Sequence, residues 1–148
     1  MSADRLARYS AMLGQLRQKD RLRALKRDTG ADFISNDYLG LAASAEMRDA
    51  LLAAIERGVP AGAGGSRLLR GNHAEHEALE EEAAAFFGCE RMLYFGSGYA
   101  ANLAILSTLP QRGDLIVYDC LVHASAHEGM KAGKAEAAAV PHNDPDAV

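Results

Sequence analysis

The hydrophobic positions in the first part of the chain follow the period of a helix. Leucines, Tyr9 and Met12 recur every three or four positions among Arg, Lys and Gln, which is the pattern of an amphipathic helix with one apolar face. Asn, Asp and Gly then gather in a segment that suits a turn. The predicted elements are a helix over 5–27 closed by Thr29-Gly30, a short strand over 33–35, a turn over 36–40 and a helix over 45–57 closed by Gly58 and Pro60.

Glycines cluster between Pro60 and Gly71 around a serine and two arginines, so the backbone there can take positive φ and approach another group closely. Asn72 is predicted as the N-cap of a helix over 73–87, and Gly88 follows its last residue. The expected buried stripe of this helix is Ala78, Leu79, Ala83 and Phe86, and its expected solvated face is Glu80, Glu81 and Glu82.

Short apolar runs alternate with helical segments through the rest of the chain. The runs are continuous rather than alternating, which is typical of strands in a parallel sheet that helices cover. We therefore predict the α/β class with a mainly parallel sheet. The predicted elements are strands over 91–95, 115–118 and 137–140 and helices over 99–109 and 125–132.

Composition adds limits to this interpretation. The 148 residues are 49% hydrophobic and 24% charged, as in a globular domain rather than a disordered or fibrous chain. A formal net charge of −4 disfavours a nucleic-acid partner. Cys89 and Cys120 lie far apart and favour reduced thiols, and no stretch has the length or apolarity of a signal peptide or bilayer span. We expect a soluble, cytoplasmic protein with no membrane partner.

One candidate for binding chemistry is Gly96-Ser97-Gly98-Tyr99, placed between a predicted strand and a predicted helix. Backbone N–H groups at a helix N-terminus are unpaired and carry the positive end of the helix dipole, so this turn can bind a phosphate. The alternative is a tight turn whose glycines only allow the chain to reverse. The nucleotide-binding patterns GxGxxG and GxxxxGK[ST] are both absent.

A second candidate is His123, which follows the next predicted strand. In an open parallel sheet the ligand crevice lies outside the carboxyl ends of the strands, so His123 is expected to face the same crevice as the glycine turn. Its imidazole could stack on a planar ring, act as acid or base, bind a metal, or simply cap a helix. The pairs His73/His76 and His123/His127 have helical spacing, but no Cys or carboxylate completes a metal site, and we expect none.

Taken together, five ordered segments resemble one family, the α-oxoamine synthases, which are fold-type I enzymes dependent on pyridoxal 5′-phosphate. This resemblance extends from the N-terminal helix to the last residues and is far more specific than any segment alone. The matching segments are Ser35–Leu41, Gly62–Asn72 with His76 and Leu79-Glu80, Phe95–Asn102, His123-Ala124-Ser125 and His142-Asn143-Asp144.

The resemblance implies a role for each candidate at the cofactor. The N–H groups of Gly98 and Tyr99 are expected to hold the cofactor phosphate, in agreement with the helix N-terminus argument. The candidate catalytic residue His123 is expected to stack on the pyridine ring.

The resemblance also implies a substrate site to which both subunits of a homodimer contribute. Arg23 is expected to contact the substrate carboxylate, for which a guanidinium is well suited. Asn36 and the loop that begins at Ser66 are expected to line the same site.

The family reaction is a decarboxylative condensation of an amino acid with an acyl thioester. The sequence of Gly64–Asn72 is most similar to the biotin-biosynthetic branch, which joins L-alanine to pimeloyl-CoA or a pimeloyl carrier-protein thioester. The alternatives within the family are 2-amino-3-ketobutyrate CoA ligase, 5-aminolevulinate synthase and serine palmitoyltransferase.

The family's Schiff-base lysine and the aspartate that pairs with the pyridine nitrogen lie beyond Val148, and no lysine of this chain matches a family lysine motif. We therefore expect residues 1–45 to form the N-terminal helix and substrate-site segment, residues 46–148 to form the first part of the cofactor-binding domain, and the chain alone to be inactive. Two other interpretations are a non-catalytic binding or assembly module and an unrelated nucleotide-binding α/β domain.

Overall fold

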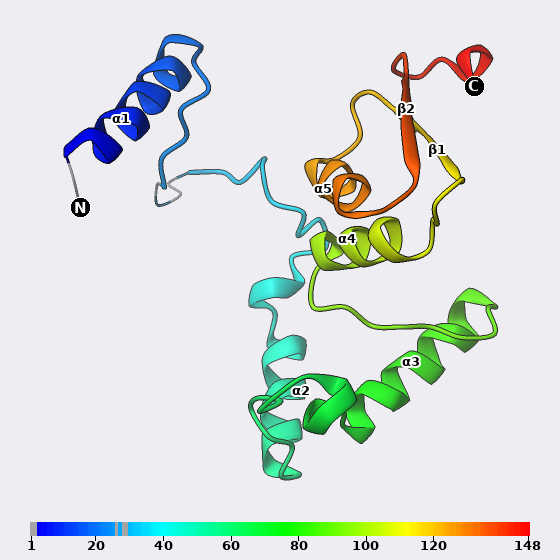
Figure 1. The fold of residues 1–148 in the computed structure, drawn as a ribbon. Coiled ribbons are helices and arrows are strands. Elements are labelled where there is room, and N and C mark those ends of the chain that lie inside the picture. The colour runs from blue at the N-terminus through cyan, green and yellow to red at the C-terminus, as the bar shows by residue number, and fades with distance from the viewer. Residues whose placement is uncertain (1–2, 26, 28–29) are drawn as a thin grey trace. The chain divides into compact units, whose positions relative to one another are not determined.

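The computed structural model describes residues 3–25, 27 and 30–148 (Figure 1). The chain forms two compact units, Met1–Pro60 and Ala61–Val148, each of which is described by itself. Residue 26 of the first predicted helix, and Thr29, which was predicted to close that helix, lie outside the described residues. The division between residues 1–45 and 46–148 was expected from the family resemblance. It is a division by role and stays a prediction, whereas the two units are defined by contacts within the chain.

In the first unit, helix α1 (Ala3–Gln18) ends well before the predicted limit at residue 27. Asp20 takes the left-handed conformation with φ 51°. Its N–H donates to the Arg17 carbonyl at 3.1 Å, and the Arg21 N–H donates to the Leu16 carbonyl at 2.8 Å. This pair of bonds is the Schellman motif, which closes the last turn of a helix. Leu22 and Leu25 therefore lie outside the helix, although their spacing matched it.

The strand predicted over 33–35 is absent from the described structure, because a side chain folds this segment into a turn. The Asp32 carboxylate accepts hydrogen bonds from the N–H groups of Ile34 and Ser35, both at 2.9 Å. Such local bonds compete with strand pairing. The turn predicted over 36–40 is confirmed, with Gly40 at φ 65° donating its N–H to the Asp37 carbonyl.

Helix α2 (Ala45–Glu56) follows the short 3-10 turn η1 (Leu41–Ala43) and matches its prediction. The Ser44 hydroxyl accepts from the Met47 N–H and begins the helix. Gly58, at φ 84°, follows the last turn as expected.

The second unit begins with the glycine-rich segment, which closes into the π-helical turn η2 (Arg67–Gly71). The Ser66 carbonyl accepts hydrogen bonds from the N–H groups of Leu69, Arg70 and Gly71. Gly71 is buried, and a Cβ there would lie 2.1 Å from the Gly65 carbonyl oxygen. Only glycine fits this turn, so the expectation of a close backbone approach is correct at Gly71.

Helix α3 (Ala74–Phe87) is capped by His73 rather than by Asn72, since the His73 Nδ1 accepts from the Glu75 N–H. Gly88 ends the helix at φ 66°, as predicted. The expected buried stripe is wrong within this structure, because Leu79 is 44% exposed and Phe86 is 82% exposed.

The strand predicted over 91–95 is an extended segment without ladder pairing. Its Tyr94 N–H donates to the Glu80 carboxylate at 2.7 Å. This N–H is therefore bonded to a side chain instead of to the carbonyl of a neighbouring strand.

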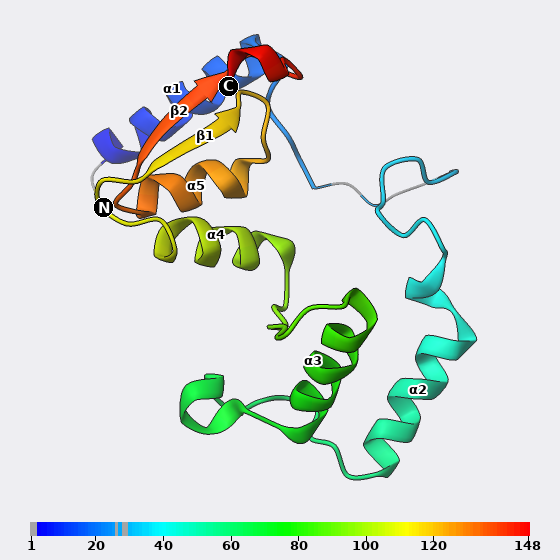
Figure 2. The same ribbon diagram turned by 90° about the vertical axis from the view of Figure 1, so that its right-hand side faces the viewer.

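The remainder of the unit is a helix followed by a β-α-β unit (Figures 1 and 2). Its two strands pair in parallel from Leu115 opposite Glu136 to Asp119 opposite Val140, which confirms the α/β class and the parallel sheet. The elements are α4 (Gly98–Thr108), β1 (Leu115–Asp119), α5 (Ala124–Ala132), β2 (Glu136–Val140) and the 3-10 turn η3 (Pro145–Ala147).

Helices α4 and α5 lie side by side in both views and contact each other backbone to backbone. A Cβ on the buried Gly129 would lie 2.9 Å from both the Asn102 carbonyl oxygen and the Leu106 Cβ. A Cβ on Gly133 would lie 2.8 Å from the Leu106 carbonyl oxygen. Since later residues of α5 meet later residues of α4, the two helices run in the same direction and their N-termini share one end.

Candidate functional site

The N-terminus of α4 offers backbone N–H groups at the shared end of the two helices. The Ser97 hydroxyl caps this helix by accepting from the Ala100 N–H at 3.1 Å. Within the described part of the chain, the N–H groups of Gly98 and Tyr99 donate to no residue. A Cβ on Gly98 would meet nothing within 4 Å, so the space beside this turn is open. The turn can therefore receive an anion from outside.

His123 lies at the N-terminus of the neighbouring helix α5, as its N-cap. Its Nδ1 accepts from the Ser125 N–H at 3.2 Å and lies 2.7 Å from the Ser125 hydroxyl oxygen. The residue is exposed, although the bonded edge of its ring is part-buried. His123 is therefore a helix cap and, at the same time, an accessible ring.

A hydrogen bond joins the two helices beneath these N-termini. The Asn102 Nδ2 group of α4 donates to the Ser125 hydroxyl oxygen of α5 at 2.9 Å, and Ser125 is fully buried. The glycine turn and His123 are thus brought to one end of one packed helix pair, and the shared ligand crevice expected from the sequence stays a prediction.

Asp119 organises the loop that leads from β1 to His123. Its carboxylate accepts from the N–H groups of Leu121 at 2.8 Å and Asn143 at 2.9 Å, and His142 Nδ1 lies 2.9 Å away. The backbone donors, followed by His142, lower the pKa of Asp119 from its usual 3.8 to about 2. Asp119 therefore ties the carboxyl ends of both strands to the loop.

Sequence reasoning gave Asp119 no role. An acidic residue at the end of a parallel strand is a recognisable signal, because that position lies at the ligand-binding edge of such sheets.

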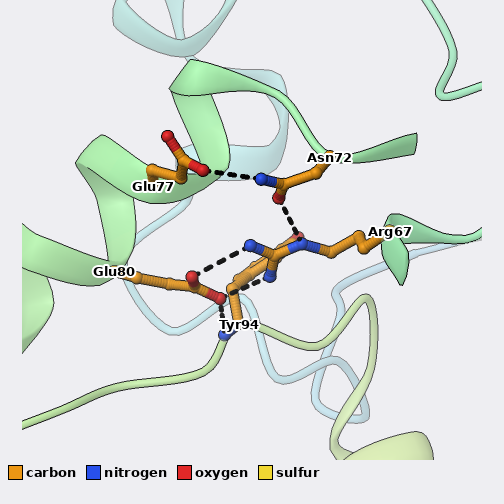
Figure 3. Close-up of polar contacts among 5 residues, drawn as sticks. All are labelled: Arg67, Asn72, Glu77, Glu80 and Tyr94. Carbon is orange, nitrogen blue, oxygen red and sulfur yellow. Dashed lines mark hydrogen bonds and ion pairs between the residues drawn. The ribbon is translucent and has the colours of Figure 1, made fainter. Parts of the chain in front are cut away.

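A second carboxylate organises the glycine-rich segment (Figure 3). The Arg67 guanidinium donates two hydrogen bonds to Glu80, at 2.5 and 3.0 Å, and its Nε donates to the Asn72 side-chain oxygen at 3.0 Å. Asn72 in turn donates to Glu77 at 2.6 Å. The ion pair with Arg67, followed by the Tyr94 N–H, lowers the pKa of Glu80 from 4.5 to about 2.

This cluster links the segment that carries Ser66 to the extended segment that precedes the glycine turn. Glu80 is the link, because it accepts from both Arg67 and the Tyr94 N–H. The expectation that Glu80 belongs to a solvated face is wrong, since its side chain is only 13% exposed. No periodicity could have revealed the pair, because Arg67 and Glu80 come from different elements.

The substrate candidates are divided between the two units. Arg23 and Asn36 belong to the first unit, where both are exposed and Arg23 lies after the end of α1. Ser66 belongs to the second unit, as do Gly98, Tyr99 and His123. The structure brings together the cofactor candidates and leaves Arg23 and Asn36 as predictions within their own unit.

The paired histidines considered as metal ligands make other contacts. His73 caps α3, His76 stacks on Tyr94 and His127 meets Tyr118 edge to face. Across the residues that are described, no group of His, Cys, Asp or Glu is arranged to hold a metal ion. Among those same residues, no helix is long and apolar enough to cross a membrane.

The sequence of this chain is similar to a known family and to several known enzymes. The family model described as aminotransferase class I and II matches residues 29–148. An 8-amino-7-oxononanoate synthase from Emericella nidulans is 47% identical over 122 residues, covering 80% of this chain and 30% of that enzyme. One from Mycolicibacterium smegmatis is 41% identical over 146 residues, covering 93% of this chain and 38% of that enzyme. The chain thus spans well under half the length of the curated relatives it matches.

Solved structures show a related arrangement. A serine palmitoyltransferase from S. paucimobilis with a bound PLP-myriocin aldimine has a TM-score of 0.69 and 32% identity over 75% of this chain and 28% of that chain. An 8-amino-7-oxononanoate synthase from Francisella tularensis has a TM-score of 0.61 and 30% identity over 74% of this chain and 30% of that chain. These similarities confirm the fold-type I assignment made from the sequence.

Proposed function

Because this chain belongs to the aminotransferase class I and II family, we propose that it provides the phosphate-binding turn and ring-stacking histidine of a pyridoxal 5′-phosphate-dependent α-oxoamine synthase. The observation that carries the proposal is the shared end of α4 and α5, where Gly98, Tyr99 and His123 lie on one packed helix pair. The relatives named 8-amino-7-oxononanoate synthase support the biotin-pathway branch.

The described residues suit a phosphorylated planar cofactor. The N–H groups of Gly98 and Tyr99 lie at the positive end of α4, where a Cβ on Gly98 would meet nothing within 4 Å. The exposed imidazole of His123 lies at the same end of the helix pair. Gly98 and Tyr99 would hold the phosphate, and His123 would cover one face of the ring. When bound, the cofactor supplies an electron sink for the carbon that loses its proton.

The residues around this end have supporting roles in the proposal. Asp119 holds the loop that presents His123, and Glu80 holds the segment before the glycine turn against the segment after Ser66. Ser66 is proposed to line the substrate site, together with Asn36. The Arg23 guanidinium is proposed to bind the substrate carboxylate, since its donors match the two oxygens of that group.

The proposed reaction joins L-alanine to pimeloyl-CoA, or to the carrier-protein thioester, with loss of carbon dioxide and release of the thiol to give 8-amino-7-oxononanoate. The proposed setting is a cytoplasmic homodimer, and the two exposed free cysteines suit a reducing compartment. A second candidate is a serine palmitoyltransferase-type condensation, favoured by the higher TM-score of that structure.

Binding of the cofactor can be tested on the chain itself. Titration with pyridoxal phosphate, followed by its visible absorbance, is expected to show binding that weakens roughly tenfold or more for pyridoxal without the phosphate. His123→Ala is expected to weaken binding with an unchanged far-ultraviolet circular dichroism spectrum. Equal binding of the two ligands would remove the phosphate role from the glycine turn.

The reaction can be tested on the protein that carries this chain. Incubation with L-alanine, L-serine or glycine and either pimeloyl-CoA or palmitoyl-CoA, followed by mass spectrometry, is expected to give 8-amino-7-oxononanoate from L-alanine and pimeloyl-CoA. A product from L-serine and palmitoyl-CoA alone would favour the second candidate, and no product with any pair would favour a non-catalytic module.

A further inference from the structure

Asn102, Ser125 and His123 form a polar chain that the proposed function does not by itself require. It runs from α4 into the fully buried hydroxyl of Ser125 and ends on Nδ1 of the exposed His123. A buried hydroxyl between an amide and an imidazole can be oriented in either direction, and the direction decides which ring nitrogen carries the proton.

In the unaltered protein, a backbone bond indicates the direction at the histidine. The Ser125 N–H donates to His123 Nδ1 at 3.2 Å. A backbone N–H can only donate, so Nδ1 must present its lone pair to it. In the neutral ring the proton therefore resides on Nε2.

The directions of the other two hydrogen bonds follow from that assignment. The Ser125 hydroxyl oxygen lies 2.7 Å from the unprotonated Nδ1, so the hydroxyl must be the donor of this bond. Its proton is then committed, and its oxygen can only accept from the other side. The Asn102 group that lies 2.9 Å from that oxygen is accordingly the NH₂.

We infer that Asn102 and Ser125 are positioning residues that hold His123 in its Nε2–H tautomer, with the Nδ1 edge tethered to α5 and the Nε2–H edge directed outward. His123 then serves as a neutral stacking ring and a hydrogen-bond donor. It does not serve as a base or metal ligand through Nδ1, because two donors occupy that nitrogen.

Close packing of α4 on α5 allows Asn102, Ser125 and His123 to form these hydrogen bonds. Gly129 lets the α5 backbone approach the Asn102 carbonyl and Leu106, which sets Ser125 opposite the Asn102 side chain. The tautomer follows from the chain's own geometry, whereas the use of the ring against pyridoxal phosphate rests on the proposed function.

The tautomer can be measured without cofactor on the chain labelled with ¹⁵N-histidine. At pH 8.5, where free imidazoles are neutral, long-range ¹H–¹⁵N spectra are expected to show His123 Nδ1 as an unprotonated nitrogen and Nε2 as a protonated one. The reverse pattern would overturn the inference.

The role of Asn102 is tested by reversing one hydrogen bond. Asn102→Asp keeps the side-chain shape but replaces the NH₂ donor with an acceptor, so the Ser125 hydroxyl is expected to donate to it. The Ser125 oxygen, 2.7 Å from Nδ1, can then accept from an Nδ1–H and compete with the longer backbone bond of 3.2 Å that favours the unprotonated Nδ1. The expected result is a shift of His123 toward the Nδ1–H form, with the His127 signals of the same spectrum unchanged as the internal control. An unshifted His123 in the folded variant would overturn the role of Asn102.

Ser125→Ala provides the second variant, because residue 125 keeps its N–H and loses only the hydroxyl. We expect the Nε2–H form to persist and Asn102→Asp to have no further effect in this background. A shift caused by Asn102→Asp in the absence of the hydroxyl would contradict transmission through Ser125.

Titration of the same variants with pyridoxal phosphate separates this inference from the proposed function. Asn102→Asp is expected to weaken binding roughly tenfold. If the unaltered chain shows the Nε2–H form but binds no pyridoxal phosphate, the proposed function fails and the tautomer assignment stands. If it binds the cofactor with His123 in the Nδ1–H form, the assignment fails and the proposed function stands.

Discussion

Arg67 and Glu80 form a bidentate ion pair, with guanidinium-to-carboxylate distances of 2.5 and 3.0 Å. The same carboxylate accepts the Tyr94 N–H at 2.7 Å. One side chain of α3 thereby holds the segment that follows Ser66 and the segment that leads into the glycine turn.

This pair makes the second unit sensitive to acid. The pKa of Glu80 is lowered from 4.5 to about 2, so its contribution to folding is present above pH 4.5 and is lost as the pH falls toward 2. Glu80→Gln keeps the shape but turns an NH₂ toward Arg67. We expect a lower melting temperature at pH 7 and a smaller further loss between pH 4.5 and 2, measured by circular dichroism.

Glu81→Gln is the matched control, because Glu81 is the next residue of the same helix and is exposed. Identical melting curves for the two variants at every pH would show that the Glu80 ion pair does not stabilise the unit.

Asp119 is expected to control the loop that presents His123. Asp119→Asn removes the negative charge that accepts hydrogen bonds from the N–H groups of Leu121 and Asn143. Both amides are therefore expected to exchange faster with deuterium at pH 7. The pKa of Asp119 is lowered from 3.8 to about 2, so in the unaltered chain this protection is lost as the pH falls from 3.8 toward 2. Asp146→Asn, in η3, is the control and should leave both exchange rates unchanged.

Gly129 is expected to be intolerant of even one methyl group. In Gly129→Ala the new Cβ would lie 2.9 Å from the Asn102 carbonyl oxygen and from the Leu106 Cβ, and such overpacking costs about 1–3 kcal/mol. Chemical denaturation should show this loss of unfolding free energy. Gly14→Ala, at an open site within α1, is the control and is expected to be neutral or to stabilise by up to about 1 kcal/mol. Equal effects of the two substitutions would argue against close packing of α4 on α5.

Gly71→Ala is expected to open the turn η2. Its Cβ would lie 2.1 Å from the Gly65 carbonyl oxygen, a backbone atom that cannot move aside without breaking the turn. The N–H groups of Arg70 and Gly71, which donate to the Ser66 carbonyl, should exchange faster in hydrogen-exchange mass spectrometry. Gly65→Ala meets nothing within 4 Å and should leave exchange near the value of the unaltered chain; an unaffected turn in Gly71→Ala would contradict the close approach.

Elements with strong local signals were predictable from the sequence. Helix α2 lies between Ser44 and Gly58, and α4 follows Ser97, because capping residues and glycines act on the nearest turn of backbone. The parallel pairing of β1 and β2 followed from continuous apolar runs separated by a helix. The placement of Gly98, Tyr99 and His123 at one end followed from this topology.

Errors arose where one residue changed the local backbone or took its hydrogen bonds. The Asp32 carboxylate turned a predicted strand into a loop, and the left-handed backbone of Asp20 ended α1 early. The Glu80 carboxylate took the N–H that a strand partner would have received. A count of apolar positions cannot anticipate a carboxylate that competes for backbone hydrogen bonds.

The sequence by itself therefore determined the family and the α/β class, and it supplied Gly98, Tyr99 and His123 as candidates for the site, because these depend on local periodicity, caps and ordered motifs. Only the tertiary structure decided how those residues are held. Arg67 with Glu80, Asp119 with Asn143, and Asn102 with Ser125 are contacts between separate elements. Their formation depends on how the backbones pack, and no spacing along the chain encodes it.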